Sequence, residues 1–83
     1  MTTLQRSDKI ELTIDPEGIA ILRMCDVAGR NAFSRTFVDE LVTALGRLDN
    51  PQVKVAVLCG LDDVFSAGGD RALLLELSQG GIA

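Results

Sequence analysis

The residues best suited to chemistry lie together in one short stretch, Phe65-Ser66-Ala67-Gly68-Gly69-Asp70. The stretch falls between an apolar run that predicts a strand and a segment that predicts a helix. Two adjacent glycines let a ligand approach the main chain closely. Amides at the start of a helix carry partial positive charge, so they can bind an anion or an oxygen that becomes negative during a reaction. A plain turn in which Asp70 caps the helix is the alternative, and the physics alone leaves both interpretations open.

The rest of the chain offers few groups for other kinds of site. It has 83 residues, no histidine, and two cysteines, Cys25 and Cys59, that lie far apart in apolar stretches. Without histidine there is no Ser-His or Cys-His machinery, and no ligand cluster predicts a metal site. No GxGxxG motif follows a strand and there is no Walker lysine, so a nucleotide-phosphate loop is not supported. We expect buried free thiols, with a disulfide as the alternative, and a solvated turn at Asp62-Asp63.

Charge and hydropathy exclude several classes of partner. The net charge is −4 and the pI is about 4.5, whereas nucleic-acid binding needs a basic face. Residues 1–9 are polar and do not form a signal peptide. No apolar run approaches the ~18 residues of a membrane span. We therefore expect a soluble, cytoplasmic protein with no nucleic-acid and no membrane partner.

Periodicity predicts the element order β, β, α, β, α. Residues 9–14 alternate between apolar and polar, and Asp15-Pro16-Glu17-Gly18 suits a type I turn into a second strand over residues 19–24. Residues 53–58 are apolar except for one lysine, which predicts a strand buried on both faces in a parallel sheet. Residues 70–78 predict a second helix.

The first helix is predicted after Ser34, a good N-cap, and before Asn50-Pro51, which ends helices. Apolar residues recur at helical spacing between these two signals and should form the buried face. They are Phe37, Val38, Leu41, Val42, Ala44, Leu45 and Leu48.

The order of these motifs resembles the opening of the crotonase (enoyl-CoA hydratase/isomerase) family. The resemblance rests on Gly18-Ile19-Ala20-Ile21-Leu22, then Asn31-Ala32-Phe33-Ser34 and a helix, then Val53–Gly60 and the Phe65–Asp70 loop. It covers roughly residues 9–77. It implies an α/β fold, the N-terminal ββαβα part of a crotonase-like fold. Residues 1–83 would form a partial domain, with residues 1–8 as a loose lead-in.

The resemblance also implies a site. The backbone amide of Gly69 matches the family position that donates one of two hydrogen bonds to a thioester carbonyl. For Asp70 we favour helix capping over acid–base catalysis. Positions that match the adenine-contacting segment and the acyl and pantetheine path are implied to bind substrate: Ala28, Gly29, Ala67, Asp70 and Arg71.

The implied activity is oxyanion-hole stabilisation of an enolate formed from an acyl-CoA or acyl-carrier-protein thioester. Gly-Gly-Asp-Arg at residues 68–71 is similar to crotonase-like enzymes of polyketide β-branching, in which dehydration or decarboxylation takes place. No cofactor is implied, because coenzyme A or phosphopantetheine is part of the substrate. The full-length form is implied to be a homotrimer or hexamer.

The chain departs from the family pattern in four respects. One is mild: Gly69 replaces the commoner alanine, but the donor there is a backbone amide. Asp26-Val27 stands where the family often has Arg-Pro, and Arg30 replaces an apolar residue, either to hold an anionic tail or simply as a solvated side chain. Family members are much longer, and their second oxyanion donor and catalytic carboxylates come from later segments. We therefore expect no activity from the 83 residues alone. The alternative function is a non-catalytic remnant or interaction module.

Overall fold

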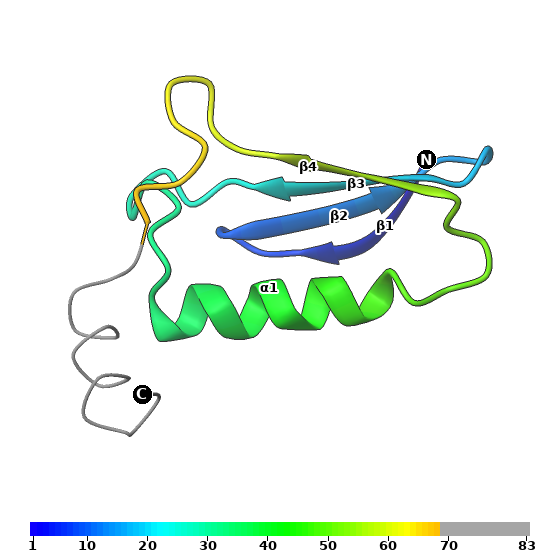
Figure 1. Ribbon diagram of the computed structural model, residues 1–83, viewed down its shortest axis with the longest axis horizontal. Coiled ribbons are helices and arrows are strands. Elements are labelled where there is room, and N and C mark those ends of the chain that lie inside the picture. The colour runs from blue at the N-terminus through cyan, green and yellow to red at the C-terminus, as the bar shows by residue number, and fades with distance from the viewer. Residues whose placement is uncertain (69–83) are drawn as a thin grey trace.

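The computed structural model describes residues 1–68, which form a four-stranded sheet with one helix against one face (Figure 1). The elements are β1 (Thr2–Arg6), β2 (Ile10–Ile14), β3 (Ile19–Met24), α1 (Arg35–Arg47) and β4 (Val55–Cys59). The strands lie in the order β1-β2-β3-β4. Only the β3–β4 pair is parallel among them. The predicted ββαβ order is confirmed for β2, β3, α1 and β4, whereas β1 was not predicted. The second predicted helix lies outside the described residues.

The hairpin between β2 and β3 has the predicted turn. The Gly18 amide donates to the Asp15 carbonyl at 3.1 Å, and the Asp15 amide donates to Ile19 at 3.0 Å. The carboxylate Oδ1 of Asp15 also accepts from the amides of Glu17 and Ile19. Gly18 has φ of 89°, a conformation that residues with a side chain resist, so glycine is required for this turn.

The N-terminal residues are not a loose lead-in, and that expectation was wrong. Thr2–Arg6 pairs antiparallel with β2, with a register shift between Thr3 and Gln5. Ser7 makes the turn, since its hydroxyl accepts from the amides of Lys9 and Ile10. Polar side chains hid the strand because an edge strand gains its stability from main-chain hydrogen bonds and can keep its side chains in water.

Helix α1 begins where the sequence predicted. The Ser34 hydroxyl accepts from the Phe37 amide at 3.2 Å, as an N-cap should. Phe37 and Ala44 are fully buried, and Leu41 and Leu48 pack around them. The predicted stripe was too wide, however. Val42 and Leu45 are exposed, because this small sheet covers only one side of the helix.

The core lies between α1 and the strands β2 and β3. Alternate residues of these strands face the helix, so the buried set has the two-residue period of a sheet with one covered face. The members are Ile10, Leu12, Ala20, Leu22, Met24, Phe37 and Ala44. None of them comes from β4.

Strand β4 is parallel to β3 as predicted, but its predicted burial was wrong. Val55, Val57 and Leu58 are 55%, 41% and 49% exposed. The register places Val55 and Val57 beside Ile19 and Ile21 on the face away from α1, and Leu58 beside Leu22 on the helix face. Both faces of β4 are uncovered because it is the edge of the described sheet and the core ends at β3.

Both cysteines are free thiols, which excludes the alternative of a disulfide between them. Cys25 and Cys59 are half-buried rather than buried; Cys25 directly follows β3 and Cys59 is the last residue of β4. None of the helices in residues 1–68 is long and apolar enough to cross a membrane.

Candidate functional site

Two loops meet at the end of the sheet where β3 and β4 finish (Figure 1). The first loop is residues 25–34 and the second is residues 60–68. Because β3 and β4 are parallel, their carboxyl ends lie at the same edge, which is where open α/β sheets bind ligands. The loops are joined by main-chain hydrogen bonds from Ala67 N to Arg30 O (3.0 Å) and from Phe33 N to Gly68 O (2.8 Å). Residues 65–68 of the motif chosen from the sequence are therefore fixed against the segment that precedes α1.

Asn31 connects the two loops through its side chain, which is fully buried. Its Nδ2 donates to the carbonyls of Met24 (2.9 Å) and Phe65 (3.0 Å), and its Oδ1 accepts from the Asp26 amide (2.8 Å). Its backbone has φ of 57°, in the left-handed region that Asn tolerates better than most residues. One side chain thus ties the end of β3 to the loop that follows β4.

Ser66 closes the second loop on itself and on the first. Its hydroxyl donates to the Asn31 carbonyl at 2.7 Å and accepts from the Gly68 amide at 3.0 Å. Gly68 has φ of 89°. Because the Gly68 amide is already used inside the loop, the next main-chain donor in the sequence is Gly69, which lies outside the described residues.

Asp26 holds the first loop in shape. The residue is buried, and its Oδ1 accepts from the Gly29 amide at 3.0 Å. The Lys9 ammonium lies 3.6 Å from Oδ2 and provides the opposite charge that a buried carboxylate needs. A short acidic side chain at this position therefore has a clear structural role.

Arg30 forms an ion pair with Asp63 across the two loops, with 3.1 Å between Nη2 and Oδ2. Both side chains are largely exposed, so the pair adds little to stability. Arg30 also has a left-handed backbone, with φ of 52°. The expectation that Asp62-Asp63 is a solvent-exposed turn is confirmed, and Arg30 has a partner in that turn.

The structure places three of the six predicted site residues. Ala28 is exposed and Gly29 is half-buried on the first loop, and Ala67 is exposed on the second. The Ala67–Arg30 hydrogen bond brings the two segments together, as a shared site requires. Gly69, Asp70 and Arg71 lie outside the described residues, and the substrate roles of all six stay predictions.

Sequence reasoning missed the side chains that build this site. The hydrogen bonds of Asn31, Ser66 and Asp26 were not foreseen, although Asn and Asp are typical of turns that need a side-chain acceptor or a left-handed residue. A signal for Asn31 was present, because the side chain of an Asn in a loop often hydrogen-bonds to nearby main-chain groups.

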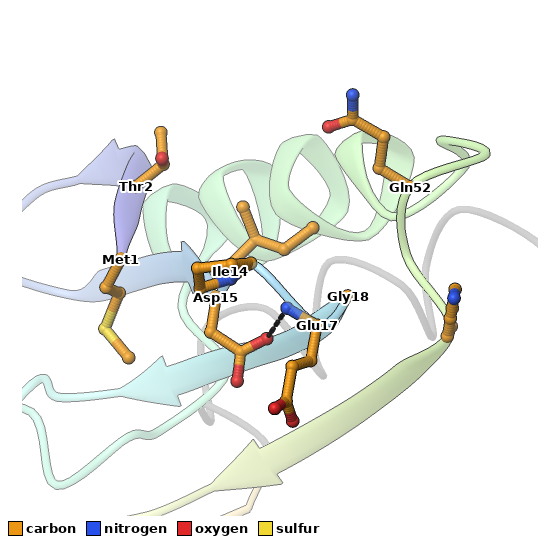
Figure 2. A pocket seen from close by; sticks show the side chains of 9 residues that line it. Met1, Thr2, Ile14, Asp15, Glu17, Gly18 and Gln52 are labelled. Atoms are coloured by element: carbon orange, nitrogen blue, oxygen red, sulfur yellow. Dashed lines mark hydrogen bonds between the residues drawn. The ribbon is translucent and has the colours of Figure 1, made fainter.

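A pocket of about 500 Å³ lies at the opposite end of the sheet, around the β2–β3 turn (Figure 2). It is lined by Met1, Thr2, Ile14, Asp15, Pro16, Glu17, Gly18, Gln52 and Lys54. Figure 2 shows the Asp15 carboxylate turned back to the Glu17 amide, so this group serves the turn. The pocket contains none of the predicted site residues. In residues 1–68, no group of three or more His, Cys, Asp or Glu side chains could hold a metal ion.

Comparison with known proteins gives a consistent result for most of the chain. Residues 15–81 match the family model described as enoyl-CoA hydratase/isomerase. Among curated proteins, the chain is 35% identical over 72 residues to the bacillaene synthase decarboxylase PksI of Bacillus subtilis (strain 168). These 72 residues are 86% of this chain and 29% of PksI.

Solved structures give the same picture for the fold. A dehydratase/decarboxylase enzyme couple of polyketide β-branching includes a chain that is 35% identical to this one, with a TM-score of 0.75, over 86% of this chain and 32% of that chain. The ECH2 decarboxylase domain of CurF from Lyngbya majuscula is 28% identical, with a TM-score of 0.73, over 93% and 32%. The chain thus spans about a third of the length of these relatives, and over that part it has their fold.

Proposed function

Since the chain belongs to the enoyl-CoA hydratase/isomerase family, we propose that it supplies one half of an acyl-thioester site of the polyketide β-branching kind. The observation that carries the proposal is the pairing of the two loops at the carboxyl ends of β3 and β4, which leads the chain directly to Gly68 and Gly69. Similarity to decarboxylases and a dehydratase/decarboxylase couple of polyketide assembly supports the subgroup.

In this proposal the Gly69 amide is one of two donors to the thioester oxygen. In a decarboxylation, the bond to the substrate carboxylate breaks, CO₂ leaves, and the electron pair moves into the thioester as an enolate. In a dehydration, a proton leaves the carbon next to the carbonyl and hydroxide is then expelled. Both reactions place negative charge on the same oxygen, and fixed amide donors stabilise that charge better than water does.

The substrate is proposed to be an acyl group on coenzyme A or on the phosphopantetheine of a carrier protein. Ala67, Asp70 and Arg71 would line the acyl and pantetheine path, and Ala28 and Gly29 would contact the adenine end of coenzyme A. No separate cofactor is needed, since the thioester carries its own activating group. The full-length form is proposed to be a cytoplasmic homotrimer or hexamer.

The 83-residue polypeptide alone should not turn over crotonyl-CoA. One amide without a second donor or a general acid or base cannot supply the barrier reduction typical of an enzyme. A test of the proposal must therefore provide the missing part of the site. PksI can do this, since it is 35% identical over the matched segment.

The test is a chimera in which residues 1–83 replace the matching segment of PksI, assayed for decarboxylation. Gly69→Pro removes the amide donor, and we expect kcat to fall by about 10²–10³. Gly69→Ala keeps the amide and should stay within a few-fold of the parent chimera. Equal activity of the two variants would contradict the role of Gly69. A folded but inactive parent chimera would favour the alternative, a non-catalytic remnant or interaction module.

A further inference from the structure

The contact between the two loops is concentrated on two side chains, Asn31 and Ser66. The Asn31 amide group uses both of its polar atoms, in three hydrogen bonds of 2.8–3.0 Å. The Ser66 hydroxyl uses its proton on the Asn31 carbonyl and a lone pair on the Gly68 amide. These two residues are adjacent in space but 35 positions apart in the chain.

We infer that Asn31 and Ser66 form a latch that positions residues 65–68 against the loop that follows β3. Asn31 is a positioning residue in this inference. It acts through the Phe65 carbonyl and through Ser66, and Gly68 is held in place by them. The latch stands on the observed contacts, and only its consequence for a thioester oxygen rests on the proposed function.

The backbone at this point supports a dedicated role for the asparagine. Arg30 and Asn31 are consecutive residues with positive φ, an arrangement that costs conformational energy in residues other than glycine. Glycine at position 31 would avoid this strain but would lose the three hydrogen bonds that the Asn31 side chain makes. The backbone strain at position 31 therefore accompanies the Asn31 side chain, which links the end of β3, the first loop and the second loop.

Asn31 also has the hydrogen-bonding character that the latch needs. Two carbonyl oxygens face its Nδ2, so this position requires a donor, while the Asp26 amide requires an acceptor. Only a neutral amide satisfies all three groups at once. An ionised carboxylate of the same shape would satisfy the Asp26 amide and leave the Met24 and Phe65 carbonyls facing negative charge.

Because position 31 must donate to two carbonyls, an acidic residue there should make the contact between the loops depend on pH, which a packing contact alone would not do. In Asn31→Asp, the introduced carboxyl can donate to one of the two carbonyls only while it is protonated. The charged groups around it are the Asp26 carboxylate with its Lys9 partner, and the Arg30–Asp63 pair on the exposed side. In this variant we therefore expect the two loops to be held together at low pH and to separate at high pH. In Asn31→Gly they should be separated at every pH, because the side-chain hydrogen bonds to Met24 and Phe65 are absent.

The experiment measures amide hydrogen exchange by NMR on the 83-residue chain and on its variants. The reporter is the Ala67 amide, which donates to Arg30 across the loops, and the reference is the Arg23 amide of β3, which lies opposite Glu11 of β2. Losing a buried hydrogen bond should lower Ala67 protection by about tenfold or more, with Arg23 little changed. For Asn31→Asp, Ala67 protection should also return as the pH falls.

Ser66→Ala is the second variant, in case Asn31→Asp does not fold. It removes the hydroxyl contacts and leaves the Asn31 amide in place, and it should lower Ala67 protection without a pH dependence of its own. The inference is overturned if Ala67 protection is unchanged in the variants that fold, or if Ala67 and Arg23 lose protection equally. Neither result depends on catalysis, so an inactive PksI chimera would leave this test intact.

Discussion

At the scale of single residues, the loop after β3 is shaped by one buried carboxylate. Asp26 accepts from the Gly29 amide and lies near the Lys9 ammonium, so it links the β1–β2 turn to the loop that approaches the candidate site. Asn31 then donates to the end of the same strand. The loop conformation therefore depends on a few polar groups, each of which has a defined partner.

Gly29 lies so close to Asp26 that no side chain fits. A Cβ atom there would collide with Asp26 Oδ2. We expect Gly29→Ala to lower the free energy of unfolding by about 1–3 kcal/mol, as overpacking does. The measurement is urea unfolding followed by circular dichroism. Gly46→Ala is the control, because nothing lies within 4 Å of that position in α1. It should raise stability by up to ~1 kcal/mol.

Cys25 should make stability depend on pH in the alkaline range. Burial raises the pKa of the Cys25 thiol above its ordinary value of 9.0, and the nearby Glu11 charge raises it further. The folded protein then holds this proton more tightly than the unfolded chain does. The free energy of unfolding should fall as the pH rises above 9.0 towards the folded-state pKa.

The check on Cys25 is a series of urea unfolding curves across this pH range under reducing conditions. Cys25→Ala should remove part of the alkaline loss of stability, whereas Cys59→Ala should leave that slope in place. The explanation fails if wild type and Cys25→Ala lose stability in parallel as the pH rises.

At the scale of elements, the strongest local signals were reliable. The Asp15–Gly18 turn and the Ser34 cap have the predicted hydrogen bonds because both depend on residues close together in the chain. The misses at β1 and β4 depended on partners elsewhere. Thr2–Arg6 became a strand because β2 offered it a free edge, and β4 is exposed because nothing in residues 1–68 covers it.

The candidate site also has a part that the sequence predicts and a part that depends on contacts between distant residues. The sequence motif located the second loop correctly, but the contacts between Asn31, Phe65 and Ser66 bridge distant parts of the chain and have no periodic signature. Only a structure could show which side chains join the two loops.

The N-cap of α1 gives a test of an element on its own. Ser34→Ala removes the acceptor for the Phe37 amide and should lower the free energy of unfolding by about 1 kcal/mol. Ser34→Asp keeps an acceptor and adds negative charge at the helix N-terminus, so it should retain the stability of the parent. Thermal unfolding followed by circular dichroism compares the three proteins. Equal losses in both variants would mean that the cap is not the cause.

At the scale of the whole molecule, the two edges of the sheet differ sharply. The β1 edge carries Gln5 and Arg6, has a register shift, and is fastened to α1 by hydrogen bonds from Gln5 to the Glu40 carbonyl and from Arg47 to Gln5. The β4 edge is Val-Ala-Val-Leu-Cys, without charge, proline or bulge. Uncharged free edges of this kind pair readily with other strands.

We therefore expect the 83-residue polypeptide to self-associate through β4. Val57→Lys places a charge in the middle of that strand, on the face away from α1, and should shift sedimentation velocity profiles towards the monomer. Thr3→Lys makes the same change of charge on β1 and should leave association unaltered. A monomeric wild-type protein at tens of micromolar would contradict this expectation, and so would equal effects of the two lysines.

The combination of antiparallel and parallel pairing in one sheet has a consequence for the time course of folding. Strands β1, β2 and β3 are consecutive in the chain and are joined by short turns, so they can pair soon after synthesis begins. Strand β4 must wait for the whole crossover of residues 25–54, because a parallel neighbour cannot be reached by a tight turn. The two loops of the candidate site flank β3 and β4, so they should meet in the last stage of folding, after the rest of the sheet is in place.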